Sequence, residues 1–189
     1  MSMSKPDWNN QAVNWRATMP IERPILGVEP SVAKKKAKSE KTHDRIFICY
    51  SHKDKRWLGE LKVSLKNISR ATVLNAWDDT RIPAGVNWRE EIERAIREAD
   101  IAIVLGSRNF MASDFITKSE LLPILKAHRR RGLPVLWIAV SYFNHEAARL
   151  GEFQALNNPL HPLSDLSRSR RDKEWVEIEN RIKQVIKTA

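Results

Sequence analysis

The segment Ile101-Ala102-Ile103-Val104-Leu105 is the clearest sign of the fold, because it has five apolar residues in a row with no polar position among them. A short strand that is apolar on both faces is typical of a parallel sheet with helices packed on both sides. Two further apolar runs cover residues 46–50 and 135–140, and a shorter one covers residues 72–74. The sequence therefore predicts a parallel sheet that contains these four strands.

Segments with the period of a helix alternate with these runs. Apolar residues recur at helical spacing within residues 57–68 and again within residues 88–99. Asn87, followed three places later by Glu90, has the form of an amino-terminal capping box. The second of these helices is therefore expected to begin directly after Asn87.

Two more helices follow the third and fourth strands. One is expected to begin near Ser113 or Asp114 and to end at Gly132, and the last covers about residues 173–188. Strands and helices that alternate this many times predict a doubly wound α/β sandwich with right-handed crossovers.

Length and composition favour a soluble, single-domain protein of a reducing compartment. The chain has 189 residues, of which 42% are hydrophobic and 30% charged, as in one soluble domain with or without an appendage. No run of about 18 apolar residues is present that would cross a bilayer, so no membrane partner is expected. The single cysteine, Cys49, excludes an intrachain disulfide and a multi-cysteine zinc site, and the start of the chain lacks the pattern of a secretory signal. A reducing, cytoplasmic location is the expectation.

The charge is concentrated in part at the amino-terminal end. Lysine and arginine number 33 against 23 acidic residues, a net charge of +10, which favours a nucleic acid, an anionic lipid or a phosphate-bearing small molecule as a partner. Residues 1–43 contain four prolines, lack a sustained apolar period and end near the lysine-rich run 34–38, so they are interpreted as a basic flexible arm before a domain at residues 44–189. The lysine run is a solvated linker or a nucleic-acid contact, and Trp8 and Trp15 are candidates for docking on the domain or on a partner.

Several chemistries are excluded by the loops that follow the strands, where ligands bind in such folds. No glycine-rich dinucleotide fingerprint and no P-loop occurs. A phosphate-accepting receiver domain needs acidic residues after the first strand and an aspartate after the third, but those places hold Ser51-His52 and Ser107-Arg108. The five histidines show no paired spacing on a helix, so no metal site is expected.

Three sequence boxes occur in order along the chain. They are residues 45–51 (RIFICYS), residues 77–79 (WDD) with residues 82–85 (IPAG), and residues 103–107 (IVLGS) with Asn109, Phe110 and Phe115 before Glu120-Leu121. Together they resemble a bacterial Toll/interleukin receptor (TIR) domain over about residues 44–187. The resemblance implies a flavodoxin-like fold with a five-strand parallel sheet. Many bacterial and plant members cleave NAD at the nicotinamide bond, whereas others only assemble as signalling scaffolds.

The resemblance implies that Glu120 is the catalytic residue. Nicotinamide is a cationic leaving group that departs neutral, so one carboxylate that holds the ribose and stabilises the developing positive charge is sufficient. The alternative is an exposed glutamate near the start of a helix, favoured there by the helix dipole. Pro123 lacks an amide hydrogen and crowds the carbonyl of Ser119, so the helix is expected to kink or loosen beside Glu120.

The same resemblance implies a set of substrate-binding residues. They are Ser51, His52, Asp79, Gly85, Phe115 and Ile116. Many active members have a tryptophan four residues before the glutamate, where this chain has Ile116. Residues 79–86 correspond to a mobile loop in which Gly85 allows a tight turn. Asp78 and Asp79 are interpreted equally well as turn and cap residues.

The leading functional hypothesis is an NAD glycohydrolase effector of bacterial antiviral defence. It would take NAD as a substrate rather than a cofactor, and release nicotinamide with linear or cyclic ADP-ribose. Its activation is expected to depend on assembly, through TIR–TIR self-association or an activating partner protein. The alternative is a non-catalytic TIR module for protein interaction in signalling. A third hypothesis is a nucleic-acid-associated subunit that uses the lysine-rich arm.

Overall fold

The computed structural model describes residues 44–70 and 73–188. The expected arm at residues 1–43, including Trp8, Trp15 and the lysine run, lies outside the described residues. The interpretation of that segment, and the nucleic-acid hypothesis that depends on it, therefore stay predictions.

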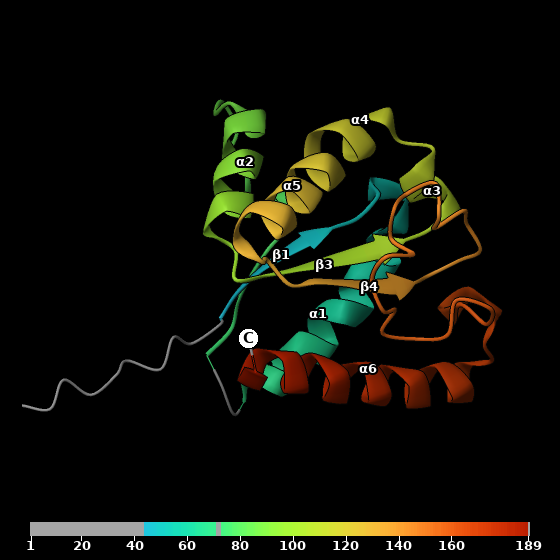
Figure 1. Cartoon of the computed structure of the whole chain (residues 1–189). Coiled ribbons are helices and arrows are strands. Elements are labelled where there is room, and N and C mark those ends of the chain that lie inside the picture. Colours follow the sequence, from blue (N-terminus) through green and yellow to red (C-terminus); the bar gives the residue numbers. More distant parts are fainter. Residues whose placement is uncertain (1–43, 71–72, 189) are drawn as a thin grey trace, which may run out of the picture. The chain divides into compact units, whose positions relative to one another are not determined.

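A parallel sheet forms the centre of the described domain. Its strands are β1 (Arg45–Cys49), β2 (Asn75–Trp77), β3 (Ile101–Gly106) and β4 (Val135–Ala139), in the spatial order β2-β1-β3-β4 (Figure 1). All three neighbouring pairs are parallel, and every residue of β3 is buried. The predicted parallel sheet and the flavodoxin-like class are thus confirmed.

The second strand lies later in the chain than predicted. The apolar run at residues 72–74 suggested a strand, but the Val73 side chain is 81% exposed and β2 begins at Asn75. The register pairs Phe47 of β1 with Trp77, and the two rings stack with their centroids 5.2 Å apart. Packing against β1 therefore positions this edge strand, whereas the local run of β-branched residues does not.

The fifth strand implied by the family resemblance is reduced to one bridge in the described residues. Ala155 forms a parallel bridge with Trp137 of β4. Next along the chain, the Asn157 side chain takes the place of a strand backbone: its Oδ1 accepts from the Ala139 N–H at 2.7 Å and its Nδ2 donates to the Ala139 carbonyl at 3.0 Å. Because one side-chain amide satisfies both polar groups of Ala139, the edge of β4 needs no regular strand there.

Helices cover both faces of the sheet, as the apolar strands predicted. Helices α1 (Lys55–Ser69) and α6 (Arg168–Thr188) lie on one face, and α2 (Trp88–Glu98) and α5 (Leu122–Arg131) lie on the other (Figure 1). Alternate residues of β1 supply the two cores: Ile46 and Ile48 pack on the α1 and α6 side, and Phe47 and Cys49 pack on the α2 and α5 side. The doubly wound sandwich is confirmed.

The helix ends agree with most of the sequence signals. Asn87 caps α2 by accepting from the Arg89 N–H at 3.2 Å, and its amide also donates to Glu90 at 2.8 Å. Gly132 ends α5 in the left-handed conformation, with φ of 70°. The last helix, α6, begins five residues before the predicted start, and α3 (Arg108–Met111) is a short helix that the sequence did not predict. None of the helices in the described ranges is long and apolar enough to span a membrane.

Candidate active site

Glu120 lies in a widened helical turn. The chain passes from α4 (Asp114–Ile116) into a π-helical turn, η3 (Thr117–Leu121), and then into α5. In this turn the Leu122 N–H donates to the Thr117 carbonyl, five residues back instead of four. Pro123 follows at the start of α5, where it has no N–H to give to the regular α-helical ladder. The predicted loosening of the helix beside Glu120 is confirmed.

The Glu120 side chain is buried rather than exposed. Glu120 is only 4% exposed. The alternative expected from the sequence, a solvent-exposed glutamate near the start of a helix, is therefore wrong. Burial raises the pKa of the Glu120 carboxyl to about 7, and the negative charge of Asp79 adds to this rise. A hydrogen bond from the Cys49 side chain acts in the opposite direction and lowers the pKa. Near neutral pH the carboxyl is therefore divided between its protonated and ionised forms.

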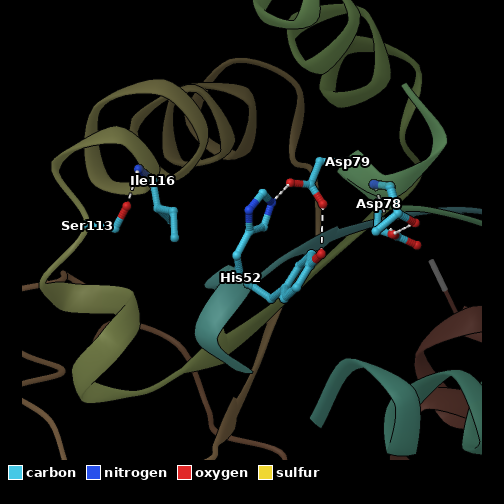
Figure 2. A network of polar contacts seen from close by, with 7 residues as sticks. His52, Asp78, Asp79, Ser113 and Ile116 are labelled. Atoms are coloured by element: carbon cyan, nitrogen blue, oxygen red, sulfur yellow. Dashed lines mark hydrogen bonds and ion pairs between the residues drawn. The ribbon is translucent and has the colours of Figure 1, made fainter. Parts of the chain in front are cut away.

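Asp79 contacts two residues that follow β1, Tyr50 and His52. The Tyr50 hydroxyl donates to Asp79 Oδ1 at 2.8 Å, and His52 Nε2 contacts Asp79 Oδ2 (Figure 2). The Asp79 side chain is 19% exposed and the His52 side chain 68% exposed. Burial, followed by the contact with Asp79, raises the pKa of Tyr50 well above its ordinary value, so its hydroxyl remains a donor. The carboxyl end of β1 and the loop after β2 are thus joined at Asp79.

The two consecutive aspartates have different roles. Asp78 is fully buried and caps η2 (Asp79–Arg81), accepting from the Thr80 N–H at 3.2 Å and pairing with Lys62 Nζ at 2.8 Å. Burial alone would raise the pKa of Asp78, but the hydrogen bonds from Lys62 and Thr80 outweigh it and lower the pKa. The turn-and-cap interpretation therefore holds for Asp78, whereas Asp79 contacts the expected site residue His52.

Ser51 is buried and shapes the loop through its backbone. Its carbonyl accepts from the Asp54 N–H at 2.7 Å at the start of the short helix η1 (His52–Asp54). The Asp54 carboxylate in turn accepts from Ser107 Oγ at 2.5 Å and from Asn109 Nδ2 at 2.9 Å. Asp54 was not predicted from the sequence as a site residue, yet its carboxylate fixes the loop after β1 to the loop after β3.

Ile116, four residues before Glu120, is buried. Its N–H donates to Ser113 Oγ at 3.3 Å, and its side chain belongs to the apolar cluster that also contains Cys49 and Leu121. Figure 2 shows the Ile116 side chain extending from its helix toward the loop that carries His52. Phe115 is part of α4, but its side chain lies outside the described residues, so its role stays a prediction.

Gly85 has the backbone conformation expected of a turn glycine. Its φ is 87°, and no atom lies within 4 Å of the position that a Cβ would take. It is exposed in the turn before α2. No hydrogen bond or ion pair found within residues 44–70 and 73–188 joins Gly85 to Asp79 or Glu120, so its part in substrate binding stays a prediction.

The residues that gather at the carboxyl ends of β1 and β2 are Cys49, Tyr50, Ser51, His52, Asp79 and Glu120. This is the place where ligands bind in open parallel sheets. The group offers one buried carboxyl that changes charge near neutral pH, and an exposed imidazole held by a second carboxylate. Within the part of the chain that is described, no group of three or more His, Cys, Asp and Glu side chains is arranged so that it could hold a metal ion.

Comparison with known proteins gives three findings. A family model described as "TIR domain" matches residues 46–158. An uncharacterised protein of Sinorhizobium fredii, y4lF, is 27% identical over 142 residues, which cover 75% of this chain but only 41% of that protein. The crystal structure of the TIR domain of the Toll-related receptor TRR-2 of Hydra magnipapillata matches with a TM-score of 0.52 at 18% identity, covering 75% of this chain and 98% of that one. The last likeness concerns the fold alone.

Proposed function

The chain belongs to the TIR domain family, and from that premise we propose that it is an NAD glycohydrolase with Glu120 as its catalytic carboxylate. The products are nicotinamide and linear or cyclic ADP-ribose. The observation that carries the proposal is the buried Glu120 at the carboxyl edge of the sheet, with its pKa raised to about 7. A carboxyl with a strongly shifted pKa at the ligand-binding edge of such a sheet is a candidate for catalysis.

The reaction breaks the bond between the ribose anomeric carbon and the nicotinamide nitrogen. The bonding electrons leave with nicotinamide, which becomes neutral, and positive charge develops on the ribose. The ionised Glu120 carboxylate stabilises that charge, and its apolar surroundings strengthen the interaction. Water then adds to the anomeric carbon and releases its proton to solvent, which gives ADP-ribose. Attack by the adenine ring in place of water gives the cyclic product.

The residues around Glu120 have proposed roles in holding NAD. His52 contacts Asp79 through Nε2, which leaves Nδ1 of the exposed ring to face the diphosphate. Asp79, fixed by Tyr50, holds this imidazole in place. Ser51, Phe115 and Ile116 are assigned to the walls of the nucleotide site.

Assembly is the proposed trigger. Glu120 is 4% exposed, so NAD reaches it only after a movement of neighbouring segments. The π-helical turn and the loop around Gly85 are candidates for that movement, since one departs from the regular helix and the other contains a left-handed glycine. Packing against a second copy or an activating partner would hold them open. In the cell the enzyme would deplete the cytoplasmic NAD pool as part of bacterial antiviral defence.

The test is nicotinamide release by the purified protein. We expect release at high protein concentration with a crowding agent, and a fall of at least about a hundredfold in Glu120→Gln. Glu177→Gln, on the exposed side of α6, is the matched control, and it should keep full activity. Full activity in Glu120→Gln would remove the assignment.

The burial of Glu120 also favours a second function, a non-catalytic interaction module for signalling. A carboxyl that substrate never reaches is a structural group, and the domain then works only through its surface. Nicotinamide release, measured together with light scattering, separates the two functions. Self-association with no nicotinamide release at any protein concentration supports the interaction module and contradicts the enzyme.

A further inference from the structure

The loops that follow β1 and β3 are joined at one buried carboxylate, that of Asp54. Asp54 lies in η1 and is 5% exposed, and its carboxylate accepts from Ser107 Oγ at 2.5 Å and from Asn109 Nδ2 at 2.9 Å. The strands β1 and β3 are neighbours, but the chain continues from β1 into α1 on one face of the sheet and from β3 toward α5 on the other (Figure 1). Open parallel sheets bind their ligands where two such loops diverge.

Arg108 lies between the two residues that the Asp54 carboxylate holds. Ser107 precedes it and Asn109 follows it, and the Arg108 N–H itself donates to Ser141 Oγ at 3.2 Å. Arg108 is exposed, and within residues 44–70 and 73–188 its guanidinium forms no ion pair or hydrogen bond. Arg108 therefore combines a fixed backbone with a cationic group that is free to bind a ligand.

The loop on the other side of this junction carries His52 and Lys53. Both are exposed residues of η1, the short helix that also contains Asp54. The contacts of one carboxylate thus fix the backbone positions of His52, Lys53 and Arg108 on two facing loops. A site whose backbone is fixed in this way loses less conformational entropy when a ligand binds.

The charges around the junction indicate which ligand group these side chains would bind. The carboxylate of Asp79 contacts His52, and its charge acts on Glu120. A dinucleotide has ionised phosphates, which carboxylates repel, so cationic groups must face its diphosphate. Arginine binds phosphate oxygens through parallel N–H groups, and lysine binds them as a point charge.

We propose that Arg108 binds the diphosphate of NAD together with Lys53 and His52 on the facing loop, and that Asp54 is the positioning residue that holds the two loops together. The identity of the ligand as NAD rests on the proposed function. The diphosphate site itself does not, because it follows from the contacts of Asp54 and from the exposed cationic groups on both sides of it.

Binding of ADP, compared with adenosine, which lacks the diphosphate, tests the site without any enzymatic activity. NMR titration of the wild type should give tighter binding of ADP than of adenosine. Arg108→Gln should weaken ADP binding by about tenfold, as for one lost hydrogen bond to a charged group, while Arg108→Lys keeps most of the affinity. Arg97→Gln, at an exposed position in the last turn of α2 beside the start of β3, is the matched control and should bind ADP as the wild type does. An ADP affinity that Arg108→Gln leaves unchanged, or a wild type that binds ADP no better than adenosine, would overturn the proposal.

The contact between Asp54 and Asn109 allows a separate test of the positioning role. Asn109→Asp places two carboxylates against each other, so the junction should open and ADP binding should weaken. Addition of Asp54→Asn exchanges the amide and the carboxylate, so that both bonds can form again and the net charge returns to that of the wild type. ADP affinity should then return to the wild-type value. A double variant that has the wild-type Tm but does not regain ADP affinity would show that Asp54 is not a positioning residue.

Steady-state kinetics relate the site to NAD. Arg108→Gln should raise the KM for NAD by about tenfold and leave kcat nearly unchanged, because the diphosphate is bound alike in the ground state and the transition state. A wild type that binds ADP through Arg108 but releases no nicotinamide would refute the proposed function and leave the diphosphate site in place. Nicotinamide release with the same KM in the wild type and Arg108→Gln would refute the site and leave the proposed function in place.

Discussion

The hydroxyl of Tyr50 donates a hydrogen bond to Asp79, with 2.8 Å between Tyr50 Oη and Asp79 Oδ1. This contact joins the residue that follows β1 to the first residue of η2. Asp79 also contacts His52, and its charge contributes to the raised pKa of Glu120. The Asp79 carboxylate therefore has two effects. Its contacts fix the loop after β2, and its charge influences the ionisation of Glu120, the proposed catalytic residue.

Tyr50→Phe should weaken this relationship without removing the ring. We expect the free energy of unfolding to fall by about 1 kcal/mol, as for one lost hydrogen bond, and the KM for NAD to rise more than kcat falls, because the loop that holds His52 is less well fixed. Urea unfolding and steady-state kinetics measure the two effects. Tyr142→Phe is the matched control, since its hydroxyl also bonds an aspartate, Asp165, but in the loop after β4. An equal change of KM in both variants would contradict the account.

Replacement of Glu120 should stabilise the protein at alkaline pH. The folded-state pKa of about 7 lies above the ordinary 4.5, so the folded protein binds this proton more readily than the unfolded chain does. The unfolding free energy contributed by this group is therefore greatest below about pH 4.5 and falls as the pH rises through 7, a loss on the order of 3 kcal/mol. Glu120→Gln should have a higher Tm than the wild type at pH 8 and a similar Tm at pH 4.5. A lower Tm at pH 8 would show that ionised Glu120 stabilises the fold.

Pro123→Ala tests the role of the widened turn. Alanine supplies the missing N–H, so η3 can return to the regular α-helical ladder and rotate Glu120 away from Cys49. We expect an unchanged or higher Tm, together with a loss of activity of about tenfold or more from misplacement of the carboxylate. Pro159→Ala, in the loop between β4 and α6, serves as the control. Wild-type turnover in Pro123→Ala would show that the π-helical turn is dispensable.

Gly85→Ala tests the loop before α2, and Gly59→Ala provides a contrast. Neither position has an atom within 4 Å of a new Cβ, but only Gly85 has a positive φ. Gly85→Ala should therefore cost roughly 1 kcal/mol in stability, while Gly59→Ala in α1 should be neutral or stabilising. If assembly through this loop activates the enzyme, specific activity should rise with concentration in Gly59→Ala and rise less in Gly85→Ala. Identical concentration curves would separate the loop from activation.

The sequence predicted those parts of the fold that local pattern determines. The apolar run at residues 101–105 forms β3, as predicted. The helical segment that carries Glu120 begins after Ser113 and ends at Gly132, also as predicted. The second strand was misplaced because Phe47, in another strand, determines its position through Trp77. The missing fifth strand depends on the Asn157 side chain, whose contact with Ala139 no local pattern reveals.

The place of the candidate site in the fold was predictable from the sequence, but the contacts between its side chains were not. The resemblance to the TIR family pointed to Glu120, His52 and Asp79, and Pro123 predicted the loosened helix. Cys49, Tyr50 and Asp54 were overlooked because their partners lie at least 29 residues away along the chain, as with Tyr50 and Asp79. Cys49 and Tyr50 both lie in the first sequence box, residues 45–51. They are consecutive residues at the carboxyl end of the first strand, where side chains from the loops of neighbouring strands are expected, so this position was a signal for both.

The most direct test of the central claim is nicotinamide release from NAD by the wild type, Glu120→Gln and Glu177→Gln, measured from pH 5.5 to 9 at a protein concentration where light scattering shows assembly. We expect the wild-type and Glu177→Gln rates to rise together through a midpoint near pH 7, while the Glu120→Gln rate stays at least about a hundredfold lower at every pH. A folded Glu120→Gln protein that keeps the wild-type rate and pH profile would contradict it.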